Sequence, residues 1–121
     1  MMYEDLLNIP YKVHGRSMTG MDCYGLVLEC CRRSGKVLPD FVYCSDKQPH
    51  GSFPEYAART GALACPRKKG AVAEYENQDG TLHVGYMVDE ENMLHMTYSG
   101  VRLSPVGIFR NVTFYEVPDV S

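Results

Sequence analysis

The sequence predicts an α+β fold, with helical segments in the first half of the chain and an antiparallel sheet in the second. Residues 1–66 contain a capped amphipathic helical pattern, and from Gly70 onward short apolar runs alternate with turn residues. Helices followed by a meander of strands are typical of the α+β class. The 121 residues, 45% of them hydrophobic and 22% charged, fit one domain that spans residues 1–121.

The clearest helical pattern covers residues 23–33. Asp22 is a favourable N-cap, and one helical stripe carries the apolar residues Cys23, Leu26, Val27 and Cys30. Ser34-Gly35 provides a stop, because glycine readily adopts the left-handed conformation that ends a helix. A second, shorter helix is expected from Ser52 through Thr60 to Gly61.

The second half of the chain predicts strands at residues 71–75, 82–88, 93–98, 101–103 and 108–117. Asp79-Gly80 is a strong hairpin signal between the first two strands. The second strand alternates, so that one face carries Leu82, Val84, Tyr86 and Val88 and the other His83, Gly85 and Met87.

Composition excludes several function classes. The formal charge is −3 with only short basic clusters, which argues against nucleic acid as a partner. No apolar run approaches the roughly 18–20 residues of a membrane span. The acidic N-terminus lacks a secretion signal, so we expect the protein to be made in the cytoplasm. Five cysteines, two of them adjacent, suit no disulfide framework, and no ligand spacing indicates zinc; we expect no metal or cofactor.

Cys23 is a candidate nucleophile. A thiol in the first turn of a helix has a lowered pKa, because the helix dipole and free backbone amides stabilise the thiolate. Such a nucleophile also needs an imidazole, and a further polar group to orient that imidazole. His83 and His95 lie on adjacent predicted strands and so are candidates for these two roles. A cysteine at a helix start and a histidine in a strand are more often core or surface residues than catalytic groups, so spacing alone favours packing over catalysis.

Three blocks of sequence carry a resemblance to a known family. They are the string Asp22-Cys23-Tyr24-Gly25-Leu26-Val27 with Tyr11 upstream and Gly35-Lys36-Val37-Leu38-Pro39 downstream, then His83-Val84-Gly85, and finally His95 followed by Ser99-Gly100. Their order and content across residues 11–103 resemble those of the NlpC-type cell-wall cysteine peptidases, the papain-like NlpC/p60 superfamily.

The resemblance implies a papain-like domain in which the cysteine-bearing helix packs on the antiparallel sheet. It implies that Cys23 attacks the substrate, that His83 is the base and that His95 orients His83. It further implies an oxyanion site built from Tyr11 and the backbone N–H of Cys23, and a substrate cleft that includes Asp22 and Tyr24. No metal takes part in this chemistry.

The chain departs from the family pattern at three places. Tyr24 replaces the usual serine, His14-Gly15 replaces a glycine pair, and Gly70-Ala71 replaces Gly-Asp. None of these changes removes a catalytic group, but they alter the surroundings of the cleft. The aromatic residue after the nucleophile resembles the phage-encoded branch of the family.

The resemblance therefore predicts a cysteine endopeptidase that hydrolyses an amide bond in peptidoglycan stem peptides. We expect it in a phage or prophage tail or virion, with phage tail proteins as partners. One alternative is a catalytically idle tail-assembly subunit with the same fold, and another is an amidase or acyl transferase on a different substrate. The sequence leaves open which bond and wall chemistry are involved, and the oligomeric state.

Overall fold

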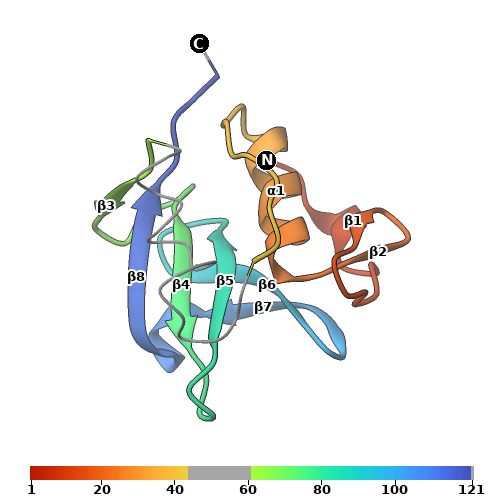
Figure 1. The fold of residues 1–121 in the computed structure, drawn as a ribbon. Coiled ribbons are helices and arrows are strands. Elements are labelled where there is room, and N and C mark those ends of the chain that lie inside the picture. The colour runs from red at the N-terminus through yellow and green to blue at the C-terminus, as the bar shows by residue number, and fades with distance from the viewer. Residues whose placement is uncertain (44–60, 121) are drawn as a thin grey trace.

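The computed structural model describes residues 1–43 and 61–120 and has the predicted α+β architecture, with one helix beside a twisted antiparallel sheet (Figure 1). The elements, in chain order, are η1 (Glu4–Leu6), β1 (Arg16–Ser17), β2 (Gly20–Met21), α1 (Cys23–Arg33), β3 (Leu63–Cys65), β4 (Val72–Glu76), β5 (Leu82–Met87), β6 (Asn92–Thr97), β7 (Gly100–Pro105), η2 (Val106–Ile108) and β8 (Arg110–Glu116). The helix expected from Ser52 to Gly61 lies almost wholly outside the described residues.

Helix α1 begins and ends where the sequence predicts. The Asp22 carboxylate accepts a hydrogen bond from the Gly25 amide at 2.7 Å, which satisfies one of the free N–H groups at the helix start. Gly35 follows the helix with a φ of 72°, a left-handed conformation that glycine adopts without steric cost. Leu26, Val27 and Cys30 are fully buried, so the predicted apolar stripe faces the core.

The main sheet has six antiparallel strands in the order β3-β8-β4-β5-β6-β7. Five of them, β4 to β8, correspond to the strands that the sequence predicts. Strand β3, which pairs with β8 about fifty residues further along the chain, and the short hairpin of β1 and β2 were not predicted from the sequence.

The two faces of the sheet are buried by different partners. Helix α1 packs against β5 and β6, and Val84 and Tyr86 join its core cluster. On the other face, Met87 and Met93 pack with Val106 of η2 in a second cluster. The alternation predicted for residues 82–88 is therefore confirmed, because Val84 and Tyr86 share one cluster and Met87 lies in the other.

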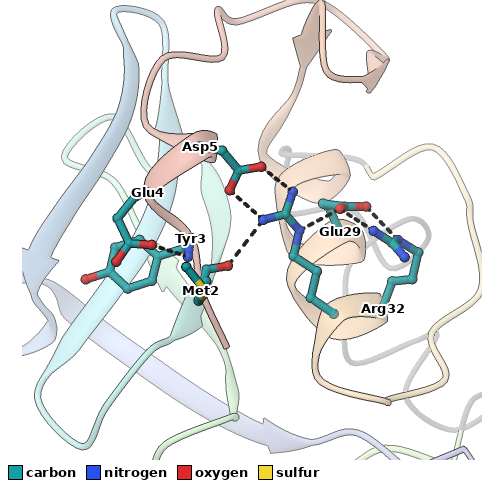
Figure 2. Close-up of polar contacts among 7 residues, drawn as sticks. Met2, Tyr3, Glu4, Asp5, Glu29 and Arg32 are labelled. Atoms are coloured by element: carbon teal, nitrogen blue, oxygen red, sulfur yellow. Dashed lines mark hydrogen bonds and ion pairs between the residues drawn. The ribbon is translucent and has the colours of Figure 1, made fainter.

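An ion-pair network fastens the N-terminal segment to the end of α1. Arg33 binds Asp5 at 2.7 Å and Glu29 at 2.7 Å, and Arg32 also binds Glu29 (Figure 2). Hydrogen bonds from Arg32 and Arg33 lower the pKa of Glu29 to about 2. The network holds η1 on the helix, and η1 leads directly into the segment that carries Tyr11.

Candidate active site

Cys23 is the first residue of α1 and lies in a cleft of about 170 Å³ at the N-terminal end of the helix. The cleft is lined by Tyr11, Val13, His14, Asp22, Cys23, Tyr43, His83, Met96 and Tyr98. It thus brings together side chains from the segment before β1, the start of α1, β5 and the β6–β7 hairpin. Two larger hollows of about 450 and 400 Å³ lie elsewhere and do not include Cys23.

The Cys23 thiol is protonated in the free protein. Burial, together with the negative charge of Asp22, raises its pKa to about 12, although the backbone of Val84, Tyr24 and Cys23 itself acts in the opposite direction. The prediction of a lowered pKa from the helix position is therefore wrong for this state of the protein. The cost of desolvating the thiolate outweighs the stabilisation that backbone N–H groups at the helix start give to it.

His83 lines the same cleft as Cys23 from β5. Its partner across the sheet is Tyr75 on β4, and the two rings lie 5.9 Å apart. Partial burial lowers the His83 pKa, against a smaller opposite effect of Asp79 in the β4–β5 turn. The imidazole is therefore mostly neutral near pH 7 and able to accept a proton, and it forms no hydrogen bond with any described residue.

His95 lies on β6, on the same face of the sheet as His83. It pairs with Gly85, so the two histidines are diagonal neighbours rather than directly opposite. Nδ1 of His95 is hydrogen-bonded to the Tyr75 hydroxyl at 3.1 Å and Nε2 to the Ser104 hydroxyl at 2.9 Å. Burial is the main cause that lowers the His95 pKa to about 4, and the nearby His83 adds to it.

The expected contact between the two imidazoles is not formed in this structure. Both ring nitrogens of His95 are bound by the hydroxyls of Tyr75 and Ser104, and His83 is not among their partners. The structure brings the histidines to one side of the cleft, since both line a second hollow of about 310 Å³ that adjoins the first at His83. Any orienting effect of His95 on His83 therefore requires a rearrangement or an indirect route through Tyr75.

Tyr11 and Asp22 line the cleft, and Tyr24 is not among the described lining residues. Tyr11 lines the cleft, and Asp22 and Cys23 are near enough to raise the pKa of its phenol, after the larger effect of burial. Asp22 lines the cleft as well, with its carboxylate held by Arg16 Nη1 at 2.6 Å. Tyr24 is fully buried, and its hydroxyl donates to the Pro39 carbonyl at 2.7 Å, so it packs the core outside the lining.

Several residues of the site were not predicted from the sequence. Tyr43 lines the cleft and donates a hydrogen bond to the buried Glu74 carboxylate at 2.5 Å. Tyr98 is 80% exposed and stands edge-on to Tyr11, with 4.9 Å between the ring centroids. Tyr75 could have been found, because the Asp79-Gly80 turn sets the register that places it opposite His83. Nothing local in the sequence marks Tyr43 or Ser104.

A thiol, a neutral imidazole and a hydroxyl line one opening. Acyl transfer through a cysteine requires these three groups. Within the described ranges, no three histidine, cysteine, aspartate or glutamate side chains gather as they would around a metal ion. None of the helices in residues 1–43 and 61–120 combines the length and apolar character needed to cross a membrane.

Comparison with known proteins agrees with this arrangement. The sequence pattern of the NlpC/P60 family matches residues 8–112, which include the cysteine helix and strands β4 to β7. A search among curated proteins gives no match. Membership implies cysteine peptidase or amidase activity on peptidoglycan, and members are typically cysteine-type hydrolases. Since the match covers most of the chain and the fold agrees with it, the protein belongs to the NlpC/P60 family.

Proposed function

We propose that the protein is a cysteine endopeptidase that hydrolyses an amide bond in peptidoglycan stem peptides, and that residues 1–121 act as one domain. The observation that carries the proposal is the shared cleft, in which Cys23 from α1 and His83 from β5 line one opening together with Tyr11. A peptide lying in this opening would place its carbonyl between the thiol and the helix N-terminus.

In the proposed reaction, His83 acts as a general base on a neutral thiol. As the Cys23 sulfur bonds to the substrate carbonyl carbon, its proton passes to His83, which then delivers it to the leaving amine. Water next attacks the acyl-enzyme, gives a proton to His83 and releases the acid, and the proton returns to the thiolate. This order suits a thiol whose pKa is raised and an imidazole whose pKa is lowered.

Other residues around the cleft would support the same reaction. The negative oxygen of the intermediate would accept hydrogen bonds from the Cys23 amide and the Tyr11 hydroxyl. Asp22 caps the helix and lies between Arg16 and Gly25, so it holds the start of α1 in place. His95, anchored by Tyr75 and Ser104, would support the wall that carries His83. Tyr24 would act only by packing beneath the cleft.

Digestion of purified cell-wall sacculi tests the proposal. We expect the wild-type protein to release muropeptides with a new amine and a new carboxyl terminus, identified by mass spectrometry. Cys23→Ala and His83→Ala should abolish release, and Cys65→Ala should retain it, because Cys65 lies on β3 and not in the cleft lining. Undiminished release by Cys23→Ala would reject the mechanism.

A catalytically idle tail-assembly subunit is the second candidate. It is favoured by the protonated Cys23 thiol and by the bonding of both His95 nitrogens to residues other than His83. Absence of digestion for the wild-type protein on sacculi of several wall chemistries would support it. An amidase or acyl transferase would use the same thiol, and the masses of the released products would separate these activities.

We propose a phage tail or virion as the place of action, with tail proteins as partners. The support is the aromatic Tyr24 after the nucleophile, which resembles the phage-encoded branch of the family. Mass spectrometry of purified phage particles provides the test: peptides of this chain should be enriched with the tail proteins. Their recovery only from the particle-free lysate would contradict the proposal.

A further inference from the structure

We propose that Tyr75 is a positioning residue for His83, and that its hydroxyl carries the influence of His95 to that imidazole. The inference rests on the proposed function, because it concerns how the base of the proposed reaction is held in place. It is carried by the ring contacts of Tyr75, by the hydrogen bonds of His95 and by an irregularity in the sheet beside them.

The His83 side chain is oriented by packing rather than by a hydrogen bond. In the part of the chain that the structure describes, its imidazole has no hydrogen-bond partner, and its ring contact is with Tyr75. The two residues pair across β4 and β5, and their rings are tilted by 32° with 5.9 Å between the centroids. Separations of about 4.5–7 Å are favourable for aromatic pairs. The orientation of the proposed base therefore depends on where the Tyr75 ring lies.

The Tyr75 ring is itself held in place at its edge and at its hydroxyl. Phe109 lies against it with 4.5 Å between the centroids, and the His95 ring stands edge-on at 6.0 Å. The Tyr75 hydroxyl is hydrogen-bonded to Nδ1 of His95 at 3.1 Å, and Nε2 of His95 is bonded to the Ser104 hydroxyl at 2.9 Å. These bonds tie the far end of Tyr75 to β6 and β7. The ring cannot shift without breaking a buried hydrogen bond, which is costly.

A bulge in β8 lies opposite Tyr75. The pairing of β4 with β8 skips Tyr75, because two residues of β8, at positions 111 and 112, face it and neither is its partner. Asn111 has a φ of 53°, which asparagine tolerates, and its amide donates to the Glu76 carboxylate at 3.0 Å. Bulges recur beside active sites, where they redirect side chains. The ladder is thus interrupted at the residue whose ring contacts both histidines.

Tyr75 acts behind His83 rather than on the substrate. It lines the hollow that adjoins the cleft at His83, and it is not among the described lining residues of the cleft that contains Cys23. Burial raises the pKa of Tyr75, so its phenol keeps the proton and can donate it to Nδ1 of His95. The hydroxyl therefore serves as an anchor, and the ring transmits its position to His83.

NMR relaxation of the ¹³C-labelled His83 ring tests the proposal without turnover. We expect one ring orientation in the wild-type protein. Tyr75→Phe keeps the ring but removes the anchor, so the His83 ring should exchange between orientations on the microsecond-to-millisecond scale.

Tyr86→Phe is the matched control for Tyr75→Phe. Both tyrosines are 3% exposed, and each variant loses one hydroxyl hydrogen bond. The Tyr86 hydroxyl binds Ser34 at the other end of α1, so its loss should leave the His83 ring unchanged. Urea midpoints should fall by similar amounts in the two variants, which separates positioning from stability.

Steady-state kinetics on soluble muropeptides that carry the bond cleaved in sacculi give a second readout. A misplaced base slows the chemical step rather than binding, so Tyr75→Phe should lower kcat about tenfold and change KM by less than about twofold. Adding His95→Leu should lower kcat no further, because both changes break the same hydrogen bond.

Several results would overturn the inference. They are a His83 ring that keeps one orientation in Tyr75→Phe, an equal response of that ring to Tyr86→Phe, an unchanged kcat in Tyr75→Phe, and losses that multiply in the double variant with His95→Leu. Exchange of the His83 ring in Tyr75→Phe alone, together with undigested sacculi, would reject the proposed function and keep the positional link between Tyr75 and His83.

Discussion

Gly25, in the first turn of α1, lies so close to Gly15 that a Cβ on Gly25 would be 2.4 Å from the Gly15 carbonyl oxygen. The same carbonyl accepts a hydrogen bond from Arg16 at 2.8 Å. This approach presses the start of the helix, with Cys23, against the segment that carries Tyr11 and His14. The relative positions of Cys23 and of one wall of the cleft therefore depend on the absence of a side chain at residue 25.

Substitution Gly25→Ala should destabilise the protein by about 1–3 kcal/mol, because the added methyl group meets backbone that cannot easily move. It should also lower hydrolytic activity, since the start of α1 would shift relative to Tyr11. Urea denaturation measures the first effect. Gly107→Ala is the matched control, as a Cβ there has no atom within 4 Å. Equal midpoints for the two variants would show that the close approach does not constrain the fold.

Arg16 should be the most important charged side chain for the stability of the cleft. Its guanidinium binds the Gly15 carbonyl, the Asp22 and Asp40 carboxylates and the Phe41 carbonyl. Arg16→Ala would leave the buried Asp22 without its cation, and we expect a loss of about 3 kcal/mol in the free energy of unfolding.

Arg32→Ala is the control for Arg16→Ala. The Arg32 side chain is 71% exposed and pairs with Glu29, so its removal should change the free energy of unfolding little, because an exposed ion pair is screened by water. Denaturation curves of both variants at the same ionic strength provide the comparison. A loss for Arg16→Ala no larger than that for Arg32→Ala would contradict the importance of the Asp22 contact.

The Cys23 thiol should be slow to alkylate in the free protein. With its pKa raised to about 12, the thiolate fraction at pH 7.5 is more than a hundredfold below that of an exposed cysteine, whose pKa is about 8.5. Burial is the larger cause of the raised pKa, and the Asp22 charge adds to it. Asp22→Asn keeps a capping oxygen but removes that charge, so alkylation of Cys23 should become faster.

Cys31 provides the internal control for this experiment. Burial raises its pKa to about 12 as well, but Asp22 is not among the causes, so its rate should not respond to Asp22→Asn. Iodoacetamide labelling of the folded protein, followed by mass spectrometry, reports both cysteines at once. Rapid labelling of Cys23 in the wild-type protein at pH 7 would instead indicate a preformed thiolate and imidazolium pair.

His95 should make stability depend on pH between about 6.5 and 4. Its pKa is about 4 in the folded protein and about 6.5 when exposed, so the unfolded chain binds more protons in this range. The contribution of neutral His95 to the free energy of unfolding is therefore fully present above pH 6.5. It is lost as the pH falls from 6.5 to 4, by up to about 3 kcal/mol. His95→Gln should show a shallower decrease in unfolding free energy from pH 7 to 4.5.

An NMR titration of the wild-type protein checks the same point without a variant. The His95 imidazole should remain neutral down to about pH 5, because protonation would place a charge in a buried position beside His83. A midpoint near pH 6.5, or identical pH profiles for wild type and His95→Gln, would show that burial does not control this residue.

Much of the fold could be predicted because its determinants are local. The cap at Asp22, the apolar stripe and the stop at Ser34-Gly35 lie within fourteen residues and define α1. The Asp79-Gly80 turn likewise fixes the β4–β5 hairpin and its alternation. Strand β3 could not be found in this way, since residues 63–65 have a weak pattern of their own and are extended only by pairing with β8.

The sequence by itself determined the class of fold, the position of Cys23 at a helix start and the order of the blocks around His83 and His95. Only the tertiary structure decided that the thiol is protonated, that Tyr24 is buried in the core, and that Tyr75 and Ser104 bind His95. Helix caps and turns depend on neighbouring residues, whereas burial and cross-strand partners depend on segments far apart in the chain. The protonation and hydrogen bonding of the proposed catalytic residues follow from the second kind of interaction.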